Sequence, residues 1–174
     1  MSKSNNEPLI LLDSDVIRHF ISGGKLEKLA SIYPGRFAIL DKVKKEICRS
    51  NNLKAIVEEF IATSAISQIV FPTDHTIIME YAYLCREFGE GESACMAVAK
   101  HQNKFIASSN LKDIGEFCKK HHITYLTTMD ILLDAAEKGI LINDECDQFI
   151  TDVLSKGSKL PCRTLKEFIE MNAK

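Results

Sequence analysis

The chain has 174 residues, of which 45% are hydrophobic and 26% charged, and its 22 Lys and Arg residues against 24 Asp and Glu residues give a net charge of −2. These values are ordinary for a globular protein. They exclude a collagen, a low-complexity disordered chain and a highly basic protein that wraps nucleic acid. A chain of this length fits one domain and can bury a full core without metal or disulfide staples. Total charge by itself gives no indication of a nucleic-acid partner.

The sequence indicates a protein of the reducing cytoplasm that makes no contact with a membrane. No apolar run approaches the roughly 18–20 residues needed to cross a bilayer. The polar N-terminal segment MSKSNNEP lacks the apolar stretch of a signal peptide. The six cysteines are widely spaced and include no CxxC pair, which favours free thiols over a zinc site or a disulfide framework.

Five short apolar runs alternate with segments of helical pattern. The predicted strands are residues 8–12, 36–40, 66–71, 104–107 and 123–126. The predicted helices are residues 16–22, 25–31, 42–50, 53–64, 75–88, 89–101, 111–121 and 129–138, followed by two more after residue 143. Asp41 is expected to cap the third helix, and Asn51 and Asn52 are expected to break the chain between the third and the fourth.

Strands that alternate with helices predict a parallel sheet covered by helices on both faces. We therefore predict an α/β fold, with a single three-layer domain built on a parallel five-stranded sheet over residues 1–141. The two last helices, in residues 142–174, are predicted to form a C-terminal extension packed on the same domain.

Acidic and polar side chains either follow the predicted strands, where ligands bind in an open parallel sheet, or begin the helix that precedes the fourth strand. The residues in such positions are Asp13, Asp15, Glu46, Glu90, Glu92, Ser108, Ser109, Asn110 and Asp113. Several oxygen ligands without His or Cys favour Mg²⁺ or Mn²⁺ over zinc. A cation would also offset the mutual repulsion of the carboxylates, and such an ion serves phosphate chemistry.

Each of these residues taken alone also has a structural interpretation. Asp13 or Ser14 could cap the first helix, and Glu46 could pair with Lys42 one helical turn away. The other candidates lie in the first turn of a helix, which caps and the helix dipole favour: Glu90, Glu92, Asn110 and Asp113. Only the shared position of all these residues at one end of the sheet favours a common site.

The motifs around these residues resemble those of PIN-domain ribonucleases. LILLDSDVI is similar to the first strand of that family, whose closing acid, here Asp13, is a metal ligand. FAILDKVKKEI resembles the second acidic motif, with Glu46, and GEGESACMAVAKHQNKFIASSNLKDI resembles the third and fourth, with Glu92 and Asp113. YLTTMDILLDAAEKGIL resembles the end of the domain in one PIN subgroup, so the resemblance covers residues 9–141.

The resemblance implies metal-dependent hydrolysis of RNA. Its catalytic residues, which would hold one or two Mg²⁺ or Mn²⁺ ions, are Asp13, Glu46, Glu92 and Asp113. Asp15 would be either an additional ligand or a helix cap. The residues expected to support the ligands or position water are Ser14, Ser108 and Asn110.

A nuclease must attract phosphates, so cations are expected at the rim of the acidic site. The candidates for binding nucleic acid are Lys42, Lys45, Arg49 and Lys112. The chain also resembles small bacterial PIN toxins, which implies an antitoxin protein as a partner and a homodimer as the assembly.

Departures from the family pattern leave other functions open. Many members have Asp where Ser109 and Asn110 stand, and Glu92 replaces the commoner Asp. One alternative is a PIN-like binding module without catalytic activity. Another is a HAD-type phosphatase, because an apolar strand followed by DSDVI resembles the first HAD motif, with Asp13 as the nucleophile and Asp15 as the general acid.

Overall fold

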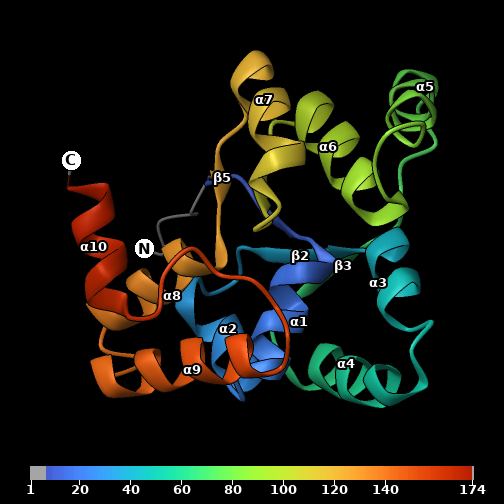
Figure 1. Ribbon diagram of the computed structural model, residues 1–174. Helices are drawn as coiled ribbons and strands as arrows, with labels where there is room; N and C mark the ends of the chain where they lie inside the picture. The colour runs from blue at the N-terminus through green and yellow to red at the C-terminus, as the bar shows by residue number, and fades with distance from the viewer. Residues whose placement is uncertain (1–6, 174) are drawn as a thin grey trace, which may run out of the picture.

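Five strands form one parallel sheet in the computed structural model, which describes residues 7–173 (Figure 1). The strands are β1 (Ile10–Leu12), β2 (Phe37–Leu40), β3 (Ser67–Ile69), β4 (Phe105–Ala107) and β5 (Tyr125–Leu126). Their order is β3-β2-β1-β4-β5, and every neighbouring pair is parallel, as predicted. The chain order reverses at β1, which has β2 on one side and β4 on the other. Ligands bind at such a reversal in open α/β sheets.

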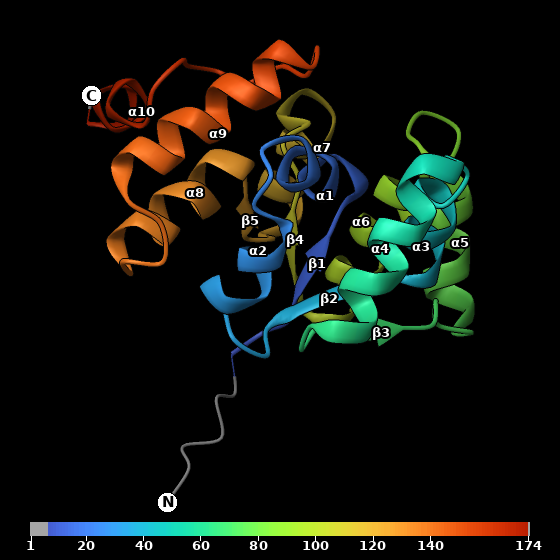
Figure 2. The same cartoon turned by 90° about the horizontal axis from the view of Figure 1, so that it is seen from below.

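Helices cover both faces of the sheet, which gives the predicted three layers. Their bounds are α1 (Ser14–Ser22), α2 (Leu26–Ile32), α3 (Asp41–Ile47), α4 (Asn51–Thr63), α5 (His75–Leu84), α6 (Glu90–Gln102), α7 (Leu111–His121), α8 (Thr128–Glu137), α9 (Asn143–Ser155) and α10 (Leu165–Asn172). Helix α6, flanked by α5 and α7, lies on one face (Figure 2). Helices α1, α2 and α8 lie on the other, with α9 packed over α1 and α8.

Several predicted helix bounds differ from the observed ones, most at the end of α5, which is Leu84 and not residue 88. Two of the differences concern the cap of α3 and the break before α4. Leu40 holds the cap position of α3, and the Asp41 carboxylate, already inside the helix, accepts hydrogen bonds from Lys42 N at 2.8 Å and Phe71 N at 3.0 Å. Asn51 is the first residue of α4 and not part of a break, because the turn between the helices is already complete at Ser50. Both errors concern capping residues whose tertiary partners the local pattern does not reveal.

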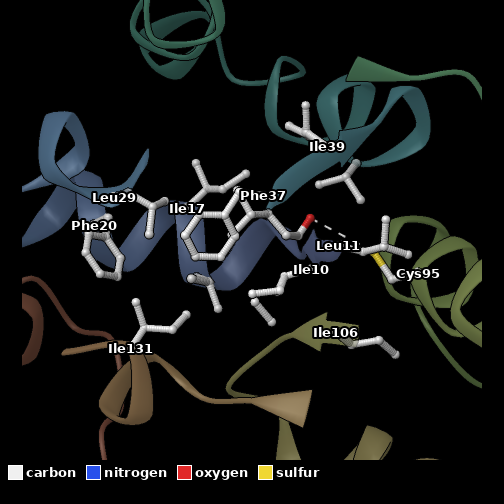
Figure 3. Packing of buried hydrophobic residues seen from close by; sticks show 14 of the residues in the cluster. Ile10, Leu11, Ile17, Phe20, Leu29, Phe37, Ile39, Cys95, Ile106 and Ile131 are labelled. Carbon is white, nitrogen blue, oxygen red and sulfur yellow. Dashed lines mark hydrogen bonds between the residues drawn. The ribbon is translucent and has the colours of Figure 1, made fainter. Parts of the chain in front are cut away.

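The strands form the centre of the core, since side chains from both faces of β1, β2 and β4 are buried (Figure 3). Ile10 lies beside Phe37 in the register of the sheet, and Leu11 lies beside Ala38. Successive side chains of a strand point to opposite faces, so Ile10 and Leu11 enter different layers. The continuous apolar runs that predicted these strands reflect burial on both faces.

Helices α9 and α10 share this core. The ring of Phe149 lies 5.0 Å from that of Phe20, between ring centroids, and Gly23 lies directly beneath it. The Lys25 ammonium forms an ion pair with Glu145 at 2.7 Å. Helix α9 therefore packs on α1, and α10 packs on α8 and α9. The division of the chain at residue 141 stays a prediction.

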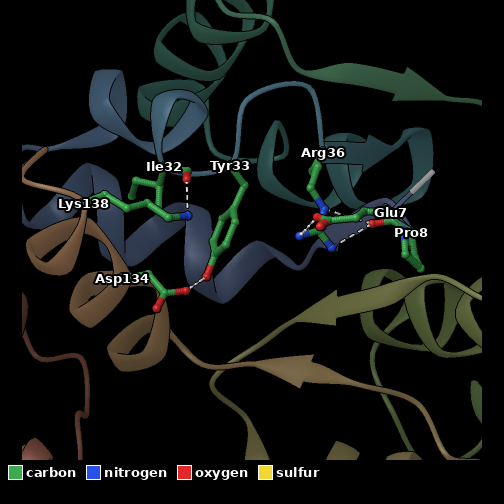
Figure 4. A network of polar contacts seen from close by, with 7 residues as sticks. All are labelled: Glu7, Pro8, Ile32, Tyr33, Arg36, Asp134 and Lys138. Carbon is green, nitrogen blue, oxygen red and sulfur yellow. Dashed lines mark hydrogen bonds and ion pairs between the residues drawn. The ribbon is translucent and has the colours of Figure 1, made fainter. Parts of the chain in front are cut away.

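A network of polar contacts lies at the end of the sheet where the strands begin (Figure 4). Arg36 Nη2 donates to Pro8 O at 3.1 Å, and its guanidinium also lies over the ring of Tyr33. The Tyr33 hydroxyl donates to Asp134, and Lys138 Nζ lies 3.9 Å from the centroid of the same ring. These contacts attach the end of α8 to the start of β2.

Within residues 7–173 there is no helix with the length and apolar character needed to cross a membrane. The prediction made for the N-terminal segment falls largely on residues 1–6, which lie outside the described part of the chain. All six cysteines are free thiols, and four of them are buried.

Candidate active site

An acidic pocket of about 290 Å³ opens at the end of β1, at the reversal of the strand order. Its lining residues are Asp13, Ser14, Asp15, Glu46, Gly89, Glu92, Asn110 and Asp113. The structure thus brings together the four carboxylates that the resemblance assigned, together with Asp15, Ser14 and Asn110. Ser108 is completely buried beside the pocket and donates a hydrogen bond of 3.5 Å from its Oγ to Asp15 Oδ2.

Asp13 fits both interpretations, as a helix cap and as a residue of the acidic pocket. It is the N-cap of α1, where its Oδ1 accepts a hydrogen bond of 2.7 Å from Ser14 N, and it also lines the acidic pocket. Only 4% of its surface is exposed. Burial, followed by the negative charge of Asp15, raises the pKa of Asp13 to about 7.

Asp15 is held from the loop after β4. Its Oδ2 accepts a hydrogen bond of 2.8 Å from Ser109 N. Its Oδ1 is buried and finds no hydrogen-bond partner among residues 7–173. Burial raises the pKa of Asp15, although the hydrogen bond from Ser109 N acts in the opposite direction. The cap of α1 is Asp13, so the interpretation of Asp15 as a helix cap is wrong.

Glu46 is fixed by two donors from other elements. Ser14 Oγ donates to Oε1 and Gly91 N donates to Oε2, both at 2.9 Å. The expected pairing with Lys42 is not formed, because Lys42 Nζ lies instead over the rings of Phe71 and Tyr81. A Cβ atom at position 91 would lie 2.6 Å from Glu46 Oε2, so this approach requires glycine. The GEGE motif contains the signal for this role, which the sequence interpretation missed.

Asn110 bridges two carboxylates. Its Nδ2 donates to Glu92 Oε1 at 3.2 Å and to Asp113 Oδ2 at 2.7 Å. Asn110 does not act as a side-chain cap, since it makes no cap hydrogen bond to α7. Burial, followed by the charges of Asp13 and Asp113, raises the pKa of Glu92 to about 8.

Buried hydrogen bonds continue behind the acidic pocket. Ser109 Oγ donates to Thr128 Oγ1 at 2.7 Å, and Thr128 N donates back to Ser109 Oγ at 2.9 Å. His19 Nδ1 lies 2.8 Å from Thr128 Oγ1. We did not predict a role for His19 or Thr128, because 109 positions separate them in the chain and no local motif includes both.

The donor atoms of the acidic pocket suit a hard divalent cation. All its charged groups are carboxylates, and burial and mutual repulsion raise the pKa values of Asp13 and Glu92. One buried oxygen, Asp15 Oδ1, lacks a partner within the described chain. In the rotamers seen here, no group of three or more His, Cys, Asp or Glu residues in the described chain could hold a metal ion together. Binding would therefore require carboxylate side chains to turn toward a common point.

The four cations proposed to bind nucleic acid differ in their surroundings. Lys42 lies over two aromatic rings, and Arg49 forms an ion pair of 2.7 Å with Glu90. Lys45 and Lys112 are exposed and form no ion pair within residues 7–173. These two are therefore the best placed of the four to meet a polyanion.

A family model described as a PIN domain matches residues 9–173. Since the match covers nearly the whole chain, the protein belongs to the PIN-domain family, whose members are generally nucleases that use divalent metals. A comparison with individually curated proteins gives no match. The match also includes both C-terminal helices, whereas the motifs in the sequence resembled the family only over residues 9–141.

Family membership removes the basis for the HAD-type interpretation. A HAD-type site also needs a later acidic pair that follows a strand, whereas the adjacent acids Asp144 and Glu145 lie in the first turn of α9. Glu145 is engaged there by Lys25.

Proposed function

We propose that the protein is a ribonuclease that hydrolyses phosphodiester bonds in RNA with the help of Mg²⁺ or Mn²⁺. The observation that carries this proposal is the convergence of carboxylates in one pocket, of which Asp13 and Glu92 are buried. Burial and neighbouring charges raise the pKa of Asp13 to about 7 and that of Glu92 to about 8. Such a concentration of negative charge is stabilised by a cation. The proposal also rests on membership of a family of nucleases.

The residues that would hold the ion or ions are Asp13, Glu46, Glu92 and Asp113. When bound, the metal supplies an activated water and stabilises the charge on the leaving oxygen. Hydrogen bonds from Ser14 and Gly91 orient Glu46. The side-chain amide of Asn110 donates to both Glu92 and Asp113 and holds these two carboxylates close together. No side-chain nucleophile is needed for this reaction class.

Replacement of single carboxylates tests the proposal. Asp13→Asn and Glu92→Gln should each lower cleavage of a labelled RNA in Mn²⁺ or Mg²⁺ by more than about 100-fold, the upper end of what losing contacts to the ligands costs. Asp144→Asn, at an exposed acid on α9, is the matched control and should cleave at the wild-type rate. Equal cleavage by wild type and Asp13→Asn would contradict the assignment of this pocket.

A binding module without catalysis is the second candidate. It is favoured by two observations: the present rotamers bring no three carboxylates of the described chain onto one ion, and Ser109 and Asn110 stand where Asp is common. Calorimetry with Mn²⁺ and RNA separates the candidates. RNA that binds but stays intact in saturating Mn²⁺ would establish the binding module.

The toxin role is a further proposal that follows from the resemblance to bacterial PIN toxins. Induced expression of the wild type in a bacterium should arrest growth, whereas expression of Asp13→Asn should not. An antitoxin partner would relieve the arrest when co-expressed, and light scattering would show a homodimer as twice the mass of the 19.5 kDa chain. Growth unaffected by the wild type would contradict the toxin role without affecting the nuclease assignment.

A further inference from the structure

A buried chain of hydrogen bonds links α1, the loop after β4 and the start of α8. Thr128 is completely buried and His19 is 6% exposed. The chain runs from His19 Nδ1 through Thr128 Oγ1 to Ser109 Oγ. The next link is through the backbone, since Ser109 N donates to Asp15 Oδ2. It therefore begins on α1 at His19 and returns to the same helix at Asp15.

The donors and acceptors of this chain are mutually consistent. Burial lowers the pKa of His19, which favours the neutral ring, so its Nδ1 can accept the Thr128 hydroxyl proton. Thr128 Oγ1 then accepts from the Ser109 hydroxyl, whose oxygen accepts in turn from Thr128 N. The hydroxyl of Ser109 is thereby engaged by Thr128 and its backbone N–H by Asp15.

The Thr128 hydroxyl is not needed to begin α8. The N-cap of that helix is Thr127, which forms a complete capping box with Asp130. A completely buried Thr that is not a cap would be replaced by Val without loss of volume, so its hydroxyl is explained by its contacts with His19 and Ser109.

We propose that His19, Thr128 and Ser109 are positioning residues that hold Asp15 in the acidic pocket as an additional metal ligand. The proposal rests on the proposed function and deepens it. One oxygen of Asp15 is engaged by Ser109 N, which leaves Oδ1 buried and without a partner in the described chain, available to a cation. Asp15 would thus supply, from α1, a carboxylate that the loop at Ser109 and Asn110 lacks.

The test compares Thr128→Val with Thr128→Ser. Calorimetry with Mn²⁺ alone measures the ion affinity, and RNA cleavage measures kcat and KM. We expect Thr128→Val to weaken Mn²⁺ affinity by about 10- to 100-fold, as for other groups that orient metal ligands, and Thr128→Ser to restore it. Asp15→Asn should produce a comparable loss, and the double variant with Thr128→Val should lose little more, because both act on one interaction.

Tyr33→Phe is the matched control, since it removes a largely buried hydroxyl at the opposite edge of the sheet. It should leave Mn²⁺ affinity unchanged, and an equal loss in this variant would overturn the inference by showing a general effect of destabilisation. Wild-type affinity in folded Thr128→Val would also overturn it. If Thr128→Val does not fold, Ser109→Ala takes its place with the same expectations.

The outcome for the wild type distinguishes this inference from the proposed function. If the wild type binds Mn²⁺ and Asp13→Asn does not, the proposed site stands whatever Thr128→Val does. If the wild type binds no Mn²⁺, the proposed function fails, and the inference fails with it.

Discussion

At the scale of single residues, the carboxylates of the acidic pocket lie close enough together to repel one another. Asp13 and Glu92 are 4% and 8% exposed, and each has other carboxylates as neighbours. The backbone donor at Ser14 and the amide of Asn110 offset only part of the resulting cost. Such an arrangement is typical of functional sites, where pKa values are perturbed more than elsewhere.

This repulsion predicts how stability depends on pH in the absence of metal. The unfolded chain releases the protons of Asp13 and Glu92 near pH 4, whereas the folded protein retains them until about pH 7 and 8. The folded state therefore binds more protons in this window, so the free energy of unfolding decreases as pH rises, by about 1.4 kcal/mol per pH unit for each retained proton. The stabilising contribution is complete below pH 4 and lost above pH 8.

Urea unfolding in EDTA between pH 5 and 9 measures this effect. Asp13→Asn should reduce the slope and should be more stable than the wild type at pH 8, because the buried amide carries no charge. Mn²⁺ at pH 8 should stabilise the wild type more than the variant. A variant with the wild-type slope would contradict the assignment of the titration to Asp13.

At the scale of elements, two glycines set the distance between neighbouring segments. Gly91 lets α6 approach the Glu46 side chain of α3, and Gly23, at the end of α1, lets Phe149 of α9 pack closely. A Cβ at position 91 would meet a carboxylate oxygen at 2.6 Å, and one at position 23 would meet an aromatic ring at 2.1 Å. Substitutions at these positions should therefore affect different properties.

Gly91→Ala should displace Glu46 and weaken Mn²⁺ binding. The added methyl would lie 2.6 Å from Glu46 Oε2, so the carboxylate must shift away from it and weaken or lose the hydrogen bond from Gly91 N. We expect a loss of affinity of about 10- to 100-fold by calorimetry. Gly115→Ala is the control, because position 115 lies within α7 with open space around it. It should stabilise the protein by about 0.5–1 kcal/mol without changing Mn²⁺ affinity.

Gly23→Ala should instead destabilise the fold. The Phe149 ring must move, and such overpacking typically costs about 1–3 kcal/mol. Chemical denaturation measures the change, with Gly115→Ala, where a Cβ meets nothing within 4 Å, as the comparison. A wild-type midpoint for Gly23→Ala would show that α9 can shift without cost, which would argue against a shared core.

At the scale of the whole molecule, the charges that sum to −2 are unevenly distributed. The acidic pocket gathers carboxylates from several elements at one end of the sheet, so the rest of the chain is mildly basic. Near-neutrality therefore does not argue against RNA as a substrate. Lys45 and Lys112, on the helices that also carry Glu46 and Asp113, are the exposed cations proposed to meet the phosphates.

Lys45→Ala and Lys112→Ala test this proposal. Each should weaken RNA binding similarly across unrelated sequences, and each should reduce the slope of log affinity against log salt by about 0.7 to 1, as expected for one lost phosphate contact. Fluorescence anisotropy in EDTA measures binding without cleavage. Lys166→Ala, on α10, is the control and should leave the slope unchanged.

Much of the fold follows from the sequence alone. Short apolar runs predicted all five strands, and in β1, β2 and β4 they reflect burial in the core, whereas β3 and β5 are partly exposed. The helical pattern of residues 111–121 predicted the bounds of α7. The acids that line the pocket were also accessible, because Asp13 directly follows a parallel strand and the others lie in helices that begin at the same end of the sheet. Position relative to a strand is a local property, which the sequence determines.

Only the tertiary structure decided what each side chain contacts. Glu46 is held by Ser14 and Gly91, which lie 32 and 45 positions away, and not by Lys42 on its own helix. Asp15 depends on Ser109, 94 positions away, and thereby on Thr128. These contacts arise where separate elements meet, and local hydrophobic periodicity carries no information on them. The sequence by itself therefore determined the sheet and the set of acids, whereas packing decided their partners, their pKa values and their orientation.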